Sequence, residues 1–316
     1  MDVLDQIEAG CLVCPRTRRR LVVSADRRWL STDEGAERYA LVNERVPILH
    51  LDPAWAEKYA GASPNMTAEY QPDTVPRRCS NIGRFKRWLL QDHRSKAVRE
   101  AFAGLFESLP DDALCISVGG GPLRSHPLLT NLNLGPFPNV DVVADAHRLP
   151  YADACVRVIY SEAVFEHLYD PATAASEINR VLRPGGKAMI HTPFLQAYHG
   201  YPHHYQNFTL TGHQRLFESA GLRVMEAGAG VGPVFTIVNL ISVFLREYTP
   251  RPLNHVLRIS WTALGTLLVP LDRILGARSN AHVLASTTYV VVEKPHSKSA
   301  ERDAPEPPAH HHQSRS

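Results

Sequence analysis

The sequence lacks the features that mark several classes of protein. Its 316 residues include only five cysteines, at positions 11, 14, 79, 115 and 155. Secreted disulfide frameworks use even, regularly spaced sets of cysteines, so this odd and scattered set predicts a reducing compartment. A strong charge imbalance is also missing, because 34 basic and 32 acidic residues leave a net charge of +2. This balance argues against a protein whose main partner is nucleic acid.

Signals for secretion or for crossing a membrane are also missing. The first ten residues carry three acids and no basic stretch ahead of an apolar run, so we expect no signal peptide and a cytoplasmic protein. Residues 227–245 are uncharged, but three glycines and a proline between 228 and 233 would break a helix there. We predict a strand end, a loop and then a helix from about Val234.

A second apolar segment, Ile259–Leu271, is 13 residues long and too short to span a bilayer. Together the two apolar segments predict a helical hairpin inserted at about residues 234–280. One interpretation is a cap packed over the core. The other is a surface that contacts a membrane or a lipid-like substrate.

The first fifty residues contain a Cys-x-x-Cys-Pro motif at Cys11–Pro15 and strand-like alternation over Tyr39–Leu49. This segment resembles the small zinc-ribbon-like domain that occurs free as a methyltransferase activator and fused ahead of some bacterial methyltransferases. Two thiolates are half of a structural zinc site, and the second pair is missing, since Ser31–Glu34 stands in its place. We therefore predict a degenerate, metal-free ribbon over residues 1–52, without zinc.

Composition divides the remainder of the chain. Several prolines among Ser, Thr and Asn mark residues 53–84 as a linker. A larger domain is expected over residues 85–295, beginning with helical periodicity in Phe85–Phe106. Residues 296–316, which end in prolines and three adjacent histidines, are predicted to form a disordered tail.

A glycine loop follows the first predicted strand of the larger domain. Ala113–Val118 is apolar and runs directly into Gly119, Gly120 and Gly121. Without Cβ atoms, such a loop can turn sharply and let its backbone contact a ligand. The loop lacks the G-x-G-x-x-G spacing and an acid about 20 residues further on, which argues against a nicotinamide-dependent oxidoreductase.

Strand-like and helical segments alternate beyond this loop, in the order of a doubly wound sheet. Asp170 and Pro171 begin one helix, and Arg183–Gly186 ends it. The remaining predicted strands cover residues 140–144, 156–160, 187–192, 222–227 and 287–293. The predicted fold class is α/β, a doubly wound, Rossmann-like sheet of about seven strands with a small N-terminal β-rich domain.

The order of the motifs resembles the class I S-adenosylmethionine-dependent methyltransferases. The motifs are Val118–Gly121, Asp145–Pro150, Phe165–His167, Glu177–Gly186 and the last strand, Tyr289–Pro295. The resemblance implies S-adenosylmethionine as the cofactor and a last strand inserted antiparallel. It also implies a cofactor site formed by Gly119, Gly120, Gly121, Asn133, Asp145, Ala146 and Ser161. Asp145 would accept a hydrogen bond from the adenine amino group.

Three positions depart from the family pattern. Ser117 stands where an acid usually precedes the glycine loop, and Asn133 stands where an acid usually accepts the ribose hydroxyls. Val156–Arg157 replaces the usual Phe-Asp. Asn133 can accept one such hydrogen bond but lacks the charge of a carboxylate, at a cost of ~1 kcal/mol or more in binding. A non-catalytic, partner-binding protein with a vestigial cofactor site is therefore the alternative to an enzyme.

A loop rich in histidine and tyrosine, Phe194–Phe208, follows the fifth predicted strand. His199 or His204 could accept the proton of an acceptor hydroxyl. The alternative is a polar loop whose histidines only form hydrogen bonds, and the sequence favours neither interpretation. Gly200 and Pro202 prevent the helix that would align His199 with His203, so no metal site is predicted. We expect methyl transfer to a small-molecule, glycan or lipid acceptor, in which alignment supplies most of the rate.

Overall fold

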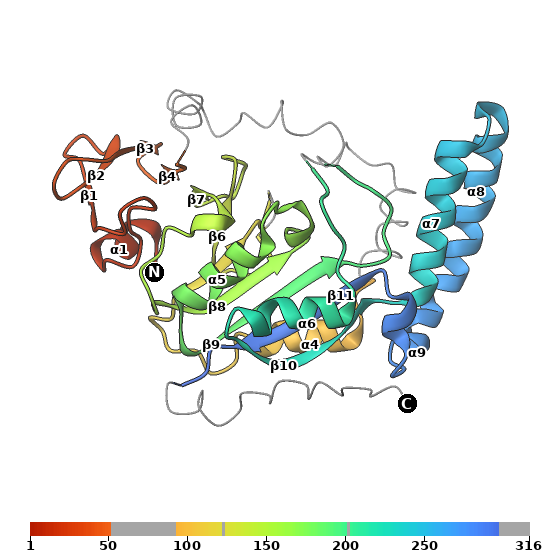
Figure 1. Ribbon diagram of the computed structural model, residues 1–316. Coiled ribbons are helices and arrows are strands. Elements are labelled where there is room, and N and C mark those ends of the chain that lie inside the picture. The colour runs from red at the N-terminus through yellow and green to blue at the C-terminus, as the bar shows by residue number, and fades with distance from the viewer. Residues whose placement is uncertain (52–92, 122–123, 201–202, 297–316) are drawn as a thin grey trace, which may run out of the picture.

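The computed structural model describes residues 1–51, 93–121, 124–200 and 203–296 (Figure 1). The predicted linker at 53–84, the first part of the helix predicted from Phe85 and the predicted tail beyond His296 lie outside these ranges. In these ranges, eleven strands form one sheet in the order β1-β2-β3-β4-β7-β6-β5-β8-β9-β11-β10. The strands are β1 (Leu21–Val23), β2 (Trp29–Thr32), β3 (Arg38–Val42), β4 (Val46–Leu49), β5 (Cys115–Val118), β6 (Leu129–Asn133), β7 (Val142–Ala144), β8 (Val156–Glu162), β9 (Leu182–Pro193), β10 (Arg223–Val231) and β11 (Thr287–Glu293).

The helices lie between these strands. The α-helices are α1 (Val3–Glu8), α4 (Lys96–Gly104), α5 (Pro171–Val181), α6 (Leu210–Ser219), α7 (Pro233–Tyr248), α8 (Arg251–Leu268) and α9 (Asp272–Leu275). Short 3-10 turns are η2 (Ala146–Arg148), η3 (Phe165–His167), η4 (Val269–Leu271) and η5 (Ala281–Leu284). The predicted N-cap is confirmed, because Asp170 accepts a hydrogen bond from the backbone N–H of Thr173 at 3.0 Å.

The central strands are parallel and buried on both faces. β5 pairs in parallel with β6 on one side and with β8 on the other, while β11 runs antiparallel between β9 and β10. Helices α5 and α6 cover one face with Ile178 and Phe217, and α4 covers the other with Val98 (Figure 1). The strand order reverses at β5, so a crevice is expected at the carboxyl ends of β5 and its neighbours.

The N-terminal segment continues this sheet. The single strand predicted over Tyr39–Leu49 is instead a hairpin of β3 and β4, because Asn43 and Glu44 adopt positive φ values and reverse the chain. β4 then pairs in parallel with β7 through Ile48 and Leu49. The first fifty residues therefore protect what would otherwise be an open edge of the sheet.

The glycines near residue 230 lie in a strand and not in the predicted loop. β10 extends to Val231 and pairs with β11 through Gly228. A Cβ atom on Gly230 would lie 2.1 Å from Nε2 of His191, and one on Gly228 would lie 3.2 Å from the ring of Tyr289. Glycine occurs here because neighbouring side chains pack directly over the backbone.

The strand predicted from Lys187 begins five residues earlier. β9 starts at Leu182, which pairs with Val156, and its register then shifts so that Lys187 pairs with Val158. The Pro-Gly-Gly segment between these two pairs is accommodated as an irregularity, with Gly185 at φ 71°. The segment Arg183–Gly186 therefore follows the end of α5, as predicted, but it lies within β9.

The predicted helical hairpin consists of α7 and α8. The expectation that it caps the core is wrong, because the two helices extend away from one end of the sheet and pack mainly on each other (Figure 1). Gly265 permits this close packing, since a Cβ there would lie 2.5 Å from Val238. Many apolar side chains remain exposed, among them Phe244 at 57% and Leu267 at 76%. Within the described residues, no helix has the length and apolar character needed to cross a bilayer.

Truncation of Ile48 tests whether the N-terminal segment is part of one cooperative fold. Ile48 is fully buried and packs with Val143 of β7. We expect Ile48→Ala to lower the free energy of unfolding by about 2–5 kcal/mol in a single transition, measured by urea denaturation. Val22→Ala, at a site that is 48% exposed, should change it by less than about 0.5 kcal/mol. A separate early transition in Ile48→Ala would contradict the shared sheet.

Candidate cofactor site

A cavity of about 270 Å³ lies where the carboxyl ends of the parallel strands meet. Its wall is mostly apolar, with a few polar groups, as is usual for sites that bind small molecules. The lining residues are Val118, Gly119, Leu132, Asn133, Leu134, Ala144, Asp145, Ala146, His147, Leu149, Ala163, Val164, His167, Leu168, Tyr169, His203 and Tyr205. Four of the seven residues predicted for the cofactor site, Gly119, Asn133, Asp145 and Ala146, are therefore brought together.

The glycine loop forms one end of this cavity. Gly119 adopts φ 76°, and a Cβ atom there would lie 2.2 Å from Cγ2 of Val164. A Cβ atom on Gly120 would lie 1.9 Å from Oδ1 of Asn131. Both backbone N–H groups donate to the carbonyl of Leu132, at 2.9 and 3.2 Å. Any larger residue would displace the turn, so the glycines are required by the backbone path itself.

Asp145 lies at the end of β7 and caps the η2 turn. Its Oδ1 accepts hydrogen bonds from the backbone N–H of His147 at 2.9 Å and from Nδ1 of the same ring at 2.6 Å. Burial opposes ionisation of this carboxyl, but the hydrogen bonds from His147 outweigh it and lower the pKa of Asp145. Among the described residues, Oδ2 has no hydrogen-bond partner, so it can accept from a ligand.

The ring of His147 is itself held in one orientation. Its Nε2 accepts from the backbone N–H of Asp170 at 3.3 Å, which leaves Nδ1 as the donor to Asp145. The ring also stacks on Tyr169, with ring centroids 4.1 Å apart. The orientation of Asp145 is thus set by a neighbour that the sequence motif does not include among the cofactor residues.

Three predicted site residues are not in the cavity wall. Gly120 and Gly121 follow Gly119 in the loop but do not line the cavity. Ser161 is 1% exposed, within β8, where it pairs with Val118 and Ile190. Ser161 does not line the cavity, although its partner Val118 does.

The two predicted histidines lie in a loop that is tied to η3. His204 has both ring nitrogens engaged, because Nδ1 accepts from the backbone N–H of His199 at 3.2 Å and Nε2 bonds Oδ1 of Asn207 at 2.6 Å. His199 donates only through Nδ1, to the carbonyl of Ala197 at 3.1 Å. The two residues are adjacent, with ring centroids 4.4 Å apart. Within the described ranges, Nε2 of His199 has no polar contact shorter than the 3.7 Å that separates it from Oε1 of Glu166.

Sequence reasoning did not anticipate the neighbours of His199. Glu166 is fully buried, and neither of its carboxylate oxygens has a hydrogen-bond partner among the described residues. Its Oε1 lies 3.7 Å from Nε2 of His199 and 3.6 Å from Nε2 of His167. The carboxylate raises the pKa of His199. The Phe-Glu-His motif could have indicated Glu166 and His167 as functional residues. Their approach to His199 was not predictable, because it depends on contact between two loops.

The two cysteines of the Cys-x-x-Cys segment, Cys11 and Cys14, lie in different surroundings. Cys14 is buried, and its Sγ lies 3.2 Å from the hydroxyl of Tyr39. Cys11 is partly exposed, and its carbonyl faces the thiol of Cys155. Glu34, one of the residues in the place of a second cysteine pair, forms an ion pair with Arg19.

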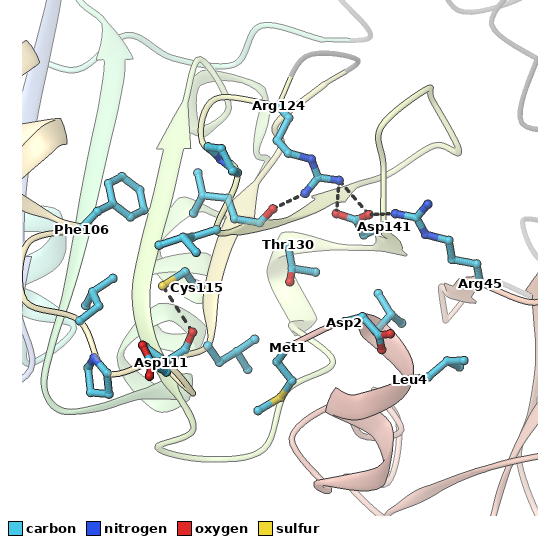
Figure 2. Close-up of a pocket in the computed structure, with 18 of the residues that line it drawn as sticks. Met1, Asp2, Leu4, Arg45, Phe106, Asp111, Cys115, Arg124, Thr130 and Asp141 are labelled. Carbon is cyan, nitrogen blue, oxygen red and sulfur yellow. Dashed lines mark hydrogen bonds and ion pairs between the residues drawn. The ribbon is translucent and has the colours of Figure 1, made fainter.

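A larger cavity of about 810 Å³ lies at the opposite ends of the strands, between α1 and the starts of β5 and β6. Figure 2 shows Asp141 held there between Arg45 and Arg124. Asp141 also accepts from the backbone N–H of Asn131 at 2.8 Å. Because its charge is already satisfied by protein groups, we do not assign a ligand to this cavity.

Known proteins resemble parts of this chain. Residues 129–190 match the family described as "Methyltransferase domain". An "Uncharacterized methyltransferase" of Mycobacterium sp. strain KMS is 30% identical over 130 residues, which is 35% of this chain and 52% of the relative. A "Probable S-adenosylmethionine-dependent methyltransferase" of Mycolicibacterium smegmatis is 45% identical over 58 residues, 18% of this chain and 23% of the relative. The chain thus spans about half the length of the first relative (52%) and about a quarter of the second (23%).

Solved structures give weaker similarity. A chain from a complex of the Haloferax volcanii Trm112 methyltransferase activator with a methyltransferase has a TM-score of 0.41 at 17% identity, covering 67% of this chain and 96% of that one. Phosphoethanolamine N-methyltransferase 2 of Haemonchus contortus, in complex with S-adenosyl-L-methionine, has a TM-score of 0.40 at 15% identity, covering 69% and 58%. The fold is defined by the strand order itself.

Residues 129–190 thus resemble a methyltransferase domain, and the matched relatives are named as methyltransferases, which supports S-adenosylmethionine as the cofactor.

Proposed function

We propose that this protein transfers the methyl group of S-adenosylmethionine to a hydroxyl of a small-molecule, glycan or lipid acceptor. The observation that carries the proposal is the cavity at the carboxyl ends of β5, β6 and β7, where Gly119, Asn133 and Asp145 converge. Its apolar wall suits the adenine ring, and Oδ2 of Asp145, which makes no hydrogen bond to the described residues, can accept from the adenine amino group. The alternative, a partner-binding protein with a vestigial site, predicts no cofactor binding.

We further propose that His199, rather than His204, acts on the acceptor. His204 uses both ring nitrogens to hold the loop, whereas Nε2 of His199 is directed at Glu166. His203, in the same loop, lines the cofactor cavity, so an acceptor bound beside His199 would lie next to the cofactor. Alignment of the acceptor oxygen with the methyl group would supply most of the acceleration.

The N-terminal segment, in this proposal, is a metal-free relative of the activator domain that is built into the same chain. Its support is the parallel pairing of β4 with β7, the strand that carries Asp145 at its end. Arg18 reinforces the contact through an ion pair with Glu177 of α5 at 3.0 Å. The segment would hold the adenine side of the site, as a separate activator subunit could.

We propose that the exposed hairpin of α7 and α8 contacts an anionic lipid surface, which fits a lipid-borne acceptor. Residues 233–284 contain five arginines and only two acids, Glu247 and Asp272. Asp272 is occupied at the start of α7, where it accepts from the backbone N–H groups of Val234 and Phe235. Exposed apolar side chains combined with an excess of arginine suit the interface of an anionic bilayer.

Replacement of Asp145 tests the cofactor site. We expect Asp145→Asn to weaken S-adenosylmethionine binding about 10-fold to 100-fold, because it removes a charge-assisted hydrogen bond worth about 1.5–3 kcal/mol. Isothermal titration calorimetry measures the change, and Asp111→Asn, an exposed site beside the other cavity, is the control. If the unaltered protein binds no S-adenosylmethionine at millimolar concentration, the vestigial-site alternative holds instead.

Restoring an acid at residue 133 should strengthen cofactor binding. The Asn133 side chain lines the cavity, and its Oδ1 accepts weakly from the backbone N–H of Gly135 at 3.5 Å. A carboxylate can accept both ribose hydroxyls, so Asn133→Asp should tighten binding about 5-fold to 10-fold by calorimetry, while Asn133→Ala should weaken it. An unchanged affinity in both variants would show that the ribose does not lie at residue 133.

Vesicle sedimentation tests the hairpin. The full-length protein should bind vesicles that contain phosphatidylglycerol more strongly than vesicles of phosphatidylcholine alone. Phe244→Glu and Leu267→Glu place charges at exposed apolar sites and should reduce binding about 10-fold each, whereas Leu128→Glu, 56% exposed and outside the hairpin, should not. Equal sedimentation of all four proteins would contradict a lipid-binding role for the hairpin.

A further inference from the structure

Three side chains beside the cofactor cavity converge on one point. Glu166 and His167 belong to the η3 turn after β8, and His199 lies in the loop after β9. Within the described ranges, they form the one group of metal-capable side chains whose ligand atoms all lie within 4.8 Å of one another. We propose that this trio binds a divalent transition-metal ion such as Zn²⁺, which positions the acceptor of the proposed methyl transfer.

The distances suit a shared ion better than direct hydrogen bonds. Oε1 of Glu166 lies 3.6 Å and 3.7 Å from the Nε2 atoms of His167 and His199. A hydrogen bond between a carboxylate and an imidazole is about 2.7–2.9 Å long, so both separations exceed it. Ligand atoms at bond lengths of about 2.0–2.2 Å around a tetrahedral ion lie about 3.3–3.6 Å apart, which is close to the separations found.

Both imidazoles are held in the orientation that metal binding requires. Nδ1 of His167 bonds the backbone carbonyl of His203 at 2.5 Å, and Nδ1 of His199 bonds the carbonyl of Ala197 at 3.1 Å. A carbonyl can only accept, so each ring donates through Nδ1, and Nε2 is the ring atom that faces Glu166 and would bind an ion in place of a proton. Outer hydrogen bonds of this kind are how metalloproteins orient histidine ligands.

The buried carboxylate of Glu166 is a second indication that a cation binds here. Glu166 is 0% exposed, and neither oxygen has a hydrogen-bond partner in the described part of the chain. An ionised carboxylate in that position is costly unless a cation compensates it. The surrounding loop is rigidly attached, since the backbone N–H of Tyr205 donates to the carbonyl of Glu166 and Gln206 donates to that of Phe165. The carboxylate is therefore kept in place with no hydrogen bond to the described residues, and the Nε2 atoms of His167 and His199 lie 3.6 Å and 3.7 Å from its Oε1.

The donor set indicates the class of metal. Two imidazoles and one carboxylate suit Zn²⁺ and its first-row neighbours better than Mg²⁺ or Ca²⁺, which prefer all-oxygen sites. Three protein ligands leave a further position open, as in catalytic metal sites. The His199 side chain is 42% exposed and that of His167 is 21% exposed, so an acceptor can reach the ion.

This role rests on the proposed methyl transfer, whereas the binding itself does not. An acceptor hydroxyl on the ion would lose its proton to solvent more readily, because the ion lowers the pKa of a bound oxygen. The acceptor oxygen then forms a bond to the methyl carbon, and the carbon–sulfur bond breaks with its electron pair left on sulfur. The products are the methylated acceptor and S-adenosylhomocysteine. His199 would thus act on the acceptor through the ion.

Metal titration of the full-length protein tests the site. After dialysis against a chelator, the protein is titrated with Zn²⁺ by calorimetry and with Co²⁺ by visible absorption. We expect Glu166→Gln and His199→Ala each to weaken binding at this site by about 100-fold or more and to abolish the absorption of Co²⁺ in an imidazole site. His282→Ala removes an exposed ring in η5, outside the trio and the cofactor cavity, and should bind as the unaltered protein does.

Stability separates metal binding from a folding defect. Without metal, Glu166→Gln should be at least as stable as the unaltered protein, because it removes a buried charge that has no hydrogen bond among the described residues. Added Zn²⁺ should raise the melting temperature through the trio only when all three ligands are present. The thiols and the C-terminal histidines are unchanged in every variant, so Zn²⁺ bound to them would affect all variants equally. Equal Zn²⁺ affinity in the unaltered protein and both trio variants would overturn the proposal. S-adenosylmethionine binding would then still support the methyltransferase assignment, with His199 as a direct base.

Discussion

The parallel pairing of β5 with β6 and β8 is the constraint on which the rest of the molecule depends. All four residues of β5 are buried, and their backbone groups are paired on both sides. A buried parallel strand must be covered on both faces, which is why α5 and α6 lie on one side and α4 on the other. Because parallel strands end at one edge, the same pairing brings the glycine loop, Asn133 and the η3 turn together.

A buried carboxylate joins the N-terminal segment to this arrangement. Glu177 of α5 accepts from the backbone N–H of Leu149 at 2.9 Å and pairs with Arg180 at 2.8 Å and with Arg18 at 3.0 Å. Leu149 follows the η2 turn that Asp145 caps. One side chain therefore links the N-terminal hairpin, the adenine side of the cavity and the covering helix, and it explains the Glu-x-x-Arg spacing in the sequence.

The site divides into two halves of different character. The half formed by Gly119, Asn133 and Asp145 follows from the ends of consecutive strands and was predictable from the order of motifs. The half formed by Glu166, His167 and His199 combines two loops that are more than thirty residues apart in the sequence. Local spacing rules exclude a metal site within His199–His204, and they say nothing about a ligand supplied by another turn.

The sequence by itself determined the order of strands and helices, the glycine turn and the position of the apolar hairpin, because these depend on local periodicity, chain-breaking residues and caps. Tertiary contacts determined which segments of the chain pack against one another. The strand predicted over Tyr39–Leu49 became a hairpin at the sheet edge, Gly230 lies in a strand because His191 packs over it, and α8 stays exposed. Each outcome depends on contacts between distant segments, which no local pattern records.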